Sequence, residues 1–226
     1  MRSVIFDLDG TIADTGGDLV AAANTCFREM GLGDILDPIS DRVAAMQGGA
    51  RAMLRVGLQR AGMDFGQEQI DEHYPAVVRA YEKELNNFTV VYDGVEQALG
   101  RLQRQGFRLG ICTNKPDHLA DMLLASLNLR AYFDCLVGAT TLAVRKPDPA
   151  PLHEAIRQLG SSARATVLIG DSKTDRETAR AADVPSVLVT FGPVGARVAE
   201  LQPDALLDHY ADIETVIAPF FKKSGS

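Results

Sequence analysis

The sequence has 226 residues, with no tryptophan, four histidines and three cysteines. Cys26, Cys112 and Cys135 lie far apart and form no C-x-x-C pair, which argues against a zinc site or a disulfide scaffold and favours buried, reduced thiols. Basic runs and apolar runs of membrane-spanning length are also absent, and the formal net charge is −7. The chain opens on a strand-like run rather than a leader. We therefore expect a cytoplasmic protein that binds neither nucleic acid nor a membrane.

The composition that remains is that of an ordinary globular protein, with 46% hydrophobic and 23% charged residues. Several short segments are almost continuously apolar, which is typical of strands buried on both faces of a parallel sheet. They are SVIFD (3–7), RLGICT (108–113), TVLIGD (166–171) and SVLVTF (186–191), with weaker runs at CLVG (135–138) and DALLD (204–208). Segments with helical spacing separate them, at 93–106, 117–129, 150–160 and 175–183. The pattern predicts an α/β fold with a doubly wound, Rossmann-like parallel sheet.

This alternation stops after the first strand. The next stretch, about seventy residues long, carries apolar stripes at helical spacing and no convincing strand. We therefore expect residues 16–87 to form a helical cap domain inserted into an α/β core made of residues 1–15 and 88–226. The last five residues, KKSGS (222–226), are not expected to be part of this fold.

Polar side chains collect where the predicted strands end, which is where ligands bind in an open α/β sheet. They are Asp7, Asp9 and Gly10 after the first strand, Thr113, Asn114 and Lys115 after the second, Lys146 in RKPDP, and Asp171 and Asp175 in GDSKTD. Two carboxylates two residues apart repel each other unless a cation lies between them. Oxygen ligands without His or Cys nearby favour Mg²⁺.

The same residues suit phosphate chemistry. Asp7 lies at the tip of the predicted strand, so its carboxylate is the better candidate for a nucleophile that forms an acyl-phosphate. Asp9 lies in the turn and can exchange a proton with a leaving group and then with water. Lys146 can neutralise charge on a transferring phosphoryl group. Asp175 is also expected to cap the helix that follows it.

Four motifs resemble, in order and spacing, those of the haloacid dehalogenase superfamily: FDLDGTIADT, TNKP, KPDP and GDSKTD. The resemblance implies a Mg²⁺-dependent phosphohydrolase with Asp7 as nucleophile and Asp9 as general acid and base. It implies that Thr113 and Lys146 hold the phosphate, and that Asp171 binds the metal with support from Asp175. Asp7 and Asp9 complete the expected metal site, and Gly10, Asn114 and Lys115 the expected substrate-binding set. An insert after the first motif is what this superfamily calls a C1 cap.

Within the superfamily, the sequence resembles most closely the bacterial phosphoglycolate phosphatases, which implies 2-phosphoglycolate as substrate. The stretches that carry this resemblance are LGICTNKP, RKPDPAPLHEA and IGDSKTDRETARAADVPSVLVTFG. The insert departs from that subgroup, because Gln47 in QGGARAML stands where a glycine is usual. Within the insert, Gly49 and Arg51 are candidate substrate-binding residues, although a solvated helix arginine is the more ordinary interpretation of Arg51.

Other activities stay open. The alternatives are a pyrophosphatase, a sugar or nucleoside-monophosphate phosphatase and, with less support, a mutase, a dehalogenase or a non-catalytic binding protein. The expected partner is a small phosphorylated metabolite, and the expected state a monomer or homodimer.

Overall fold

The computed structural model describes residues 1–221, so the KKSGS tail lies outside the described residues. The chain forms two compact units: unit 1 joins Met1–Ala13 to the chain from Val91 onward, and unit 2 is Asp14–Val90. The two-residue strands β2 (Ala13–Asp14) and β3 (Val90–Val91) pair with each other, and the chain passes from one unit to the other within them. Whether unit 2 acts as a cap stays a prediction.

Unit 1 is built on a six-stranded sheet, which confirms the predicted doubly wound α/β fold. The strands are β1 (Ser3–Phe6), β4 (Arg108–Cys112), β5 (Cys135–Val137), β6 (Thr166–Gly170), β7 (Ser186–Val189) and β8 (Ala205–Leu207). Their spatial order is β5-β4-β1-β6-β7-β8, and every neighbouring pair is parallel. The first strand therefore lies in the middle of the sheet, which places its carboxyl end at the centre of the ligand-binding edge.

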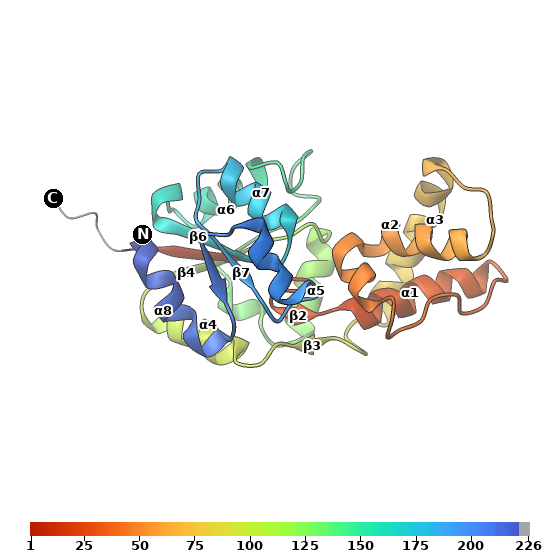
Figure 1. Ribbon diagram of the computed structural model, residues 1–226, viewed down its shortest axis with the longest axis horizontal. Coiled ribbons are helices and arrows are strands. Elements are labelled where there is room, and N and C mark those ends of the chain that lie inside the picture. The colour runs from red at the N-terminus through yellow and green to blue at the C-terminus, as the bar shows by residue number, and fades with distance from the viewer. Residues whose placement is uncertain (222–226) are drawn as a thin grey trace. The chain divides into compact units, whose positions relative to one another are not determined.

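Helices cover both faces of this sheet. They are α4 (Val95–Arg104), α5 (Asp117–Ser126), α6 (Ala150–Gln158), α7 (Lys173–Ala181) and α8 (Ile213–Ile217). Helices α6 and α7 lie on one face and α4 and α8 on the other (Figure 1). Because both faces are covered, Ile5 and its neighbours Val4 and Phe6 are all fully buried, which explains the unbroken apolar run.

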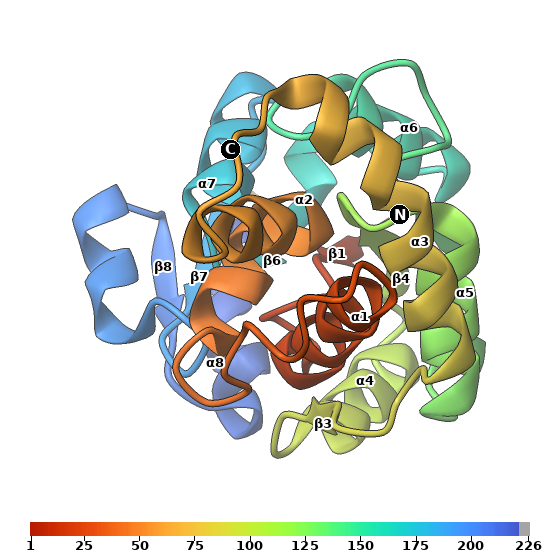
Figure 2. The same cartoon turned by 90° about the vertical axis from the view of Figure 1, so that its right-hand side faces the viewer.

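Unit 2 consists of three helices, α1 (Gly16–Glu29), α2 (Arg42–Arg60) and α3 (Gln67–Lys83). Helix α1 packs against both of the others (Figure 2). The approach of α1 to α2 is close, because a Cβ atom on Gly57 would lie 2.1 Å from the ring of Phe27. Within residues 1–221, no helix combines the length and the apolar character that crossing a bilayer requires.

Cys26, Cys112 and Cys135 are free and buried, as predicted from their apolar surroundings. Burial raises the pKa of Cys112 and of Cys135 to about 12, so both stay protonated thiols. They belong to the core.

Candidate active site

The turn after β1 aims Asp7 and Asp9 at the edge of the sheet. The backbone N–H of Asp7 donates to the carbonyl of Ile169 at 2.9 Å, so the strand pairing with β6 continues through this residue. The chain then turns, and the N–H groups of residues 11, 12 and 13 all point to the carbonyl of Leu8. Gly10 has φ +84°, a left-handed conformation that glycine adopts without strain.

Glycine is required at this position for a second reason. A Cβ atom on Gly10 would lie 2.6 Å from Oδ2 of Asp171, and one on Gly192 would lie 2.7 Å from the carbonyl oxygen of Gly10. The backbone of the turn therefore lies directly against the Asp171 carboxylate. A buried hydrogen bond also fixes the turn, because the Tyr210 hydroxyl donates to the carbonyl of Thr11 at 2.9 Å.

Register places Thr113 and Asp171 on opposite sides of the end of β1. Phe6 is opposite Ile111 on β4 and Ile169 on β6, so Thr113 and Asp171 both fall at the level of Leu8. Thr113 is buried, and its Oγ1 accepts a hydrogen bond from the N–H of Lys115 at 3.2 Å. The Asn114 side-chain amide donates to the carbonyl of Lys146 at 2.9 Å, which ties the two phosphate-binding loops predicted from the sequence together.

Lys146 reaches the site from the loop before α6. Its side chain is 2% exposed, and its ammonium lies 3.0 Å from Oδ1 of Asp7 and 2.6 Å from Oδ1 of Asp175. Burial opposes the charged form of Lys146, but the carboxylates of Asp175 and Asp7 outweigh it and raise the pKa of the lysine. The site therefore holds a permanent cation beside Asp7.

Asp171 and Asp175 come from the junction of β6 and α7, but Asp175 is not the N-cap residue of the helix. Ser172 is the N-cap residue: its Oγ accepts from the N–H of Asp175 at 3.3 Å, and Asp175 returns the contact in a capping box. Oδ2 of Asp175 accepts from the N–H groups of Asp171 and Ser172, at 3.2 and 3.1 Å. Both Asp175 oxygens are thus engaged, one by Lys146 and one by this turn.

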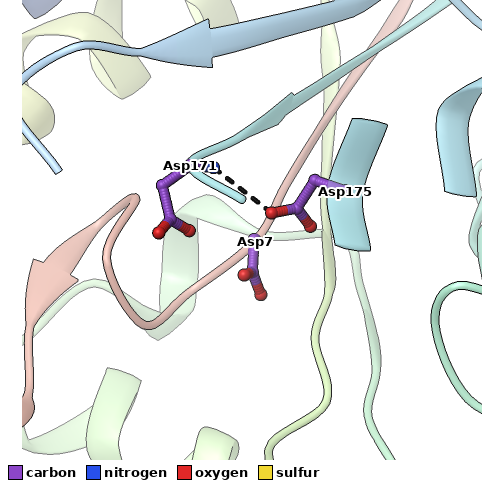
Figure 3. A group of neighbouring side chains, drawn as sticks. All are labelled: Asp7, Asp171 and Asp175. Atoms are coloured by element: carbon purple, nitrogen blue, oxygen red, sulfur yellow. Dashed lines mark hydrogen bonds between the residues drawn. The ribbon is translucent and has the colours of Figure 1, made fainter. Parts of the chain in front are cut away.

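Asp7, Asp171 and Asp175 offer ligand oxygens that all lie within 4.8 Å of one another (Figure 3). Burial raises the pKa of Asp7 to about 6, against the opposing effect of Lys146, and it raises the pKa of Asp171 well above its ordinary value, with further contributions from Asp175 and Asp7. The single positive charge of Lys146 therefore does not offset the carboxylates of this cluster.

The donor set fits a divalent cation. Oδ1 of Asp7 is buried and accepts no hydrogen bond from the described residues, although the ammonium of Lys146 lies near it. All the candidate ligands are oxygens, which is the chemistry that Mg²⁺ prefers. Asp7 and Asp171 are the best placed to bind it, since Asp175 is already committed to hydrogen bonds.

The structure also reveals contacts that the sequence did not predict. Asp9 is paired with Lys115, whose ammonium lies 3.0 Å from Oδ1 of Asp9, and the Thr11 hydroxyl donates to Oδ1 of Asp171 at 3.3 Å. Each carboxylate of the D-x-D pair thus has a lysine from a different loop. Lys146 and Lys115 therefore provide part of the positive charge expected from the sequence near Asp7 and Asp9.

Gly49 and Arg51 lie in unit 2. Gly49 has φ +62° and breaks α2 into two segments. The Arg51 guanidinium forms an ion pair with Asp71 of α3 and stacks on the Tyr74 ring, 4.2 Å from its centroid. Both contacts come from α3, and the assignment of these residues to substrate stays a prediction.

Comparisons with known proteins agree with these motifs. The sequence model of the haloacid dehalogenase-like hydrolase family matches residues 4–189 of this chain. A phosphoglycolate phosphatase of Agrobacterium fabrum is 34% identical over 207 residues, covering 92% of this chain and 88% of that protein. One of Xanthomonas campestris pv. campestris is 38% identical over 191 residues, 84% of each protein. The crystal structure of a predicted phosphoglycolate phosphatase of Haemophilus somnus is similar in fold, with a TM-score of 0.84 at 24% identity over 95% of this chain and 97% of that one.

Proposed function

The chain belongs to the haloacid dehalogenase-like hydrolase family, and from that membership we propose that it is a Mg²⁺-dependent phosphomonoesterase working through an aspartyl-phosphate. One observation carries the proposal: Asp7 ends the central strand with an oxygen that accepts no hydrogen bond from the described residues, beside the buried ammonium of Lys146. A carboxylate held next to a fixed cation is suited to attack on a phosphoryl group, whose charge the cation offsets.

We assign the bond-making steps to Asp7 and Asp9. Asp7 attacks phosphorus, the bond from phosphorus to the leaving oxygen breaks, and Asp9 gives that oxygen its proton. Water then attacks the phosphorus of the aspartyl-phosphate while Asp9 takes its proton, and the bond to Asp7 breaks to release inorganic phosphate. Thr113, Lys146 and the backbone near Gly10 would hold the phosphoryl oxygens during both steps.

The metal site is proposed at the same edge. Asp7 and Asp171 would be direct ligands, and Asp9, which the resemblance adds to the set, follows Asp7 in the same turn. Asp175 would hold Lys146 and the turn at Ser172 in place, given its hydrogen bonds. When bound, Mg²⁺ would neutralise negative charge on the phosphoryl oxygens.

We propose 2-phosphoglycolate as the substrate, because several relatives at 31–38% identity are named phosphoglycolate phosphatases. Pyrophosphate, sugar phosphates and nucleoside monophosphates are the competing substrates. The helical unit 2 would select among them as a cap, with Gly49 and Arg51 as the candidate contacts.

The test is kcat/KM for phosphate release with Mg²⁺ across 2-phosphoglycolate, pyrophosphate, a hexose phosphate, a nucleoside monophosphate and p-nitrophenyl phosphate. A preference for 2-phosphoglycolate of about a hundredfold supports the substrate assignment. A flat profile keeps the phosphatase chemistry and rejects that substrate. Absence of phosphate release from every compound rejects the proposed chemistry.

A further inference from the structure

We propose that Lys115 is a positioning residue that holds the carboxylate of Asp9 where it exchanges protons with the leaving group. The inference rests on the proposed function and departs from the expectation that Lys115 binds substrate. It starts from the pairing of Lys115 with Asp9 across 3.0 Å, between residues 106 positions apart in the chain.

The position of Lys115 is set by its own backbone. Its N–H donates to Oγ1 of Thr113 at 3.2 Å, and its carbonyl accepts from the N–H of Ala139 at 3.0 Å. Gly138 packs against that carbonyl so closely that a Cβ atom there would lie 2.7 Å from the carbonyl oxygen. The backbone N–H of Lys115 is therefore tied within its own loop after β4, and its carbonyl is tied to the turn that follows β5.

The Lys115 side chain is buried, and its ammonium is directed at Asp9. It is 5% exposed, against 18% for the Asp9 side chain. A buried ammonium is costly unless it is paired with an anion, so this pair is a stable part of the site and not a chance surface contact. Lys146 already serves Asp7 and Asp175, which leaves the second lysine to a different carboxylate.

Position matters for the residue that Lys115 holds. In the first step Asp9 must deliver a proton to the leaving oxygen as the phosphorus–oxygen bond breaks, and this requires hydrogen-bond reach. Asp9 lies in a turn, where its side chain would otherwise choose among several rotamers. A fixed ammonium at one carboxylate oxygen selects one orientation, and it also reduces repulsion between Asp9 and Asp7.

The experiment measures kcat/KM of Lys115→Met and of the wild type with Mg²⁺ on three substrates. They are 2-phosphoglycolate, an alkyl phosphate without a carboxylate such as glycerol 1-phosphate, and p-nitrophenyl phosphate. Lys83→Met, which removes an exposed lysine at the end of α3, is the matched control. Circular dichroism melts establish that each variant is folded.

A positioning role predicts a loss that depends on the leaving group. Alkyl leaving groups need the proton, so kcat/KM should fall about a hundredfold for both alkyl phosphates. The p-nitrophenolate leaving group needs little protonation, so its kcat/KM should fall less than about fivefold. Lys115→Met should cost almost nothing in the Asp9→Asn background, because the lysine acts through Asp9. Lys115→Arg should recover part of the loss, because it keeps a positive charge at this position.

Three results would overturn the assignment while phosphate release by the wild type upholds the proposed function. An equal loss on all three substrates means that Lys115 binds the phosphoryl group they share. A loss confined to 2-phosphoglycolate means that it reads the substrate carboxylate. Unchanged kinetics mean that the ion pair is structural. A wild type that releases no phosphate from any of them rejects the proposed function and this inference with it.

Discussion

Replacing Asp7 with asparagine is expected to stabilise the protein in the absence of metal while abolishing phosphate release. Asp7 is 9% exposed and its carboxyl pKa is raised from 3.8 to about 6, chiefly because burial disfavours the charged form. A raised folded-state pKa means that folding favours the neutral acid. Asparagine is a neutral group of the same shape.

The magnitude follows from the two pKa values. A raise from 3.8 to about 6 corresponds to as much as about 3 kcal/mol of unfolding free energy. The contribution of Asp7 to stability is complete below the unfolded-state pKa of 3.8 and is lost as the pH rises through the folded-state pKa of about 6. The advantage of the asparagine variant should therefore grow between these values and stay constant above them.

The assay is urea unfolding in EDTA, followed by far-ultraviolet circular dichroism because the chain has no tryptophan. Asp212→Asn, which neutralises an exposed aspartate, should change the unfolding free energy by less than about 0.5 kcal/mol. Adding Mg²⁺ should stabilise the wild type more than Asp7→Asn, because an ionised Asp7 is a proposed ligand. A variant that is less stable than the wild type in EDTA at neutral pH refutes the electrostatic reasoning.

Three further predictions concern the metal, the turn and the buried lysine. EDTA should abolish phosphate release and excess Mg²⁺ should restore it, and full turnover in EDTA would remove the metal from the account. Gly10→Ala should cost more stability and activity than Gly106→Ala, because both glycines are left-handed but only at Gly10 would the Cβ meet a neighbour, at 2.6 Å. Equal costs would show that the Asp171 contact is unimportant. Lys146→Met should lower kcat by about a hundredfold or more and destabilise the fold, and a variant with near-normal kcat would exclude the lysine from the phosphoryl site.

The sheet was predictable because its four inner strands, β1, β4, β6 and β7, are buried on both faces. That burial leaves an unbroken apolar run such as SVIFD, and the residues after such runs meet at one edge of a parallel sheet. Asp7, Thr113 and Asp171 follow from this rule alone. Strand order did not follow, because an apolar run carries no information on which neighbour it pairs with.

The hydrogen-bond partners within the site were not predictable. Lys115 was expected to bind substrate and is instead paired with Asp9, because a loop residue's side-chain direction depends on backbone angles that the sequence pattern does not encode. The capping of α7 is an exception: Ser172 is the N-cap residue and Asp175 is at N3, an arrangement that the spacing S-x-x-D indicates. Arg51 pairs with Asp71 across two helices, which helical periodicity within α2 does not indicate.

The proposed aspartyl-phosphate is tested most directly by looking for the phosphoryl group on Asp7. The enzyme is mixed with Mg²⁺ and substrate, quenched in acid within the first turnover, digested and analysed by peptide mass spectrometry. We expect the peptide carrying Asp7 to gain one phosphoryl group, and the same peptide of Asp7→Asn to gain none. Phosphate release without a labelled Asp7, or with the phosphoryl group on another residue, would contradict this proposal.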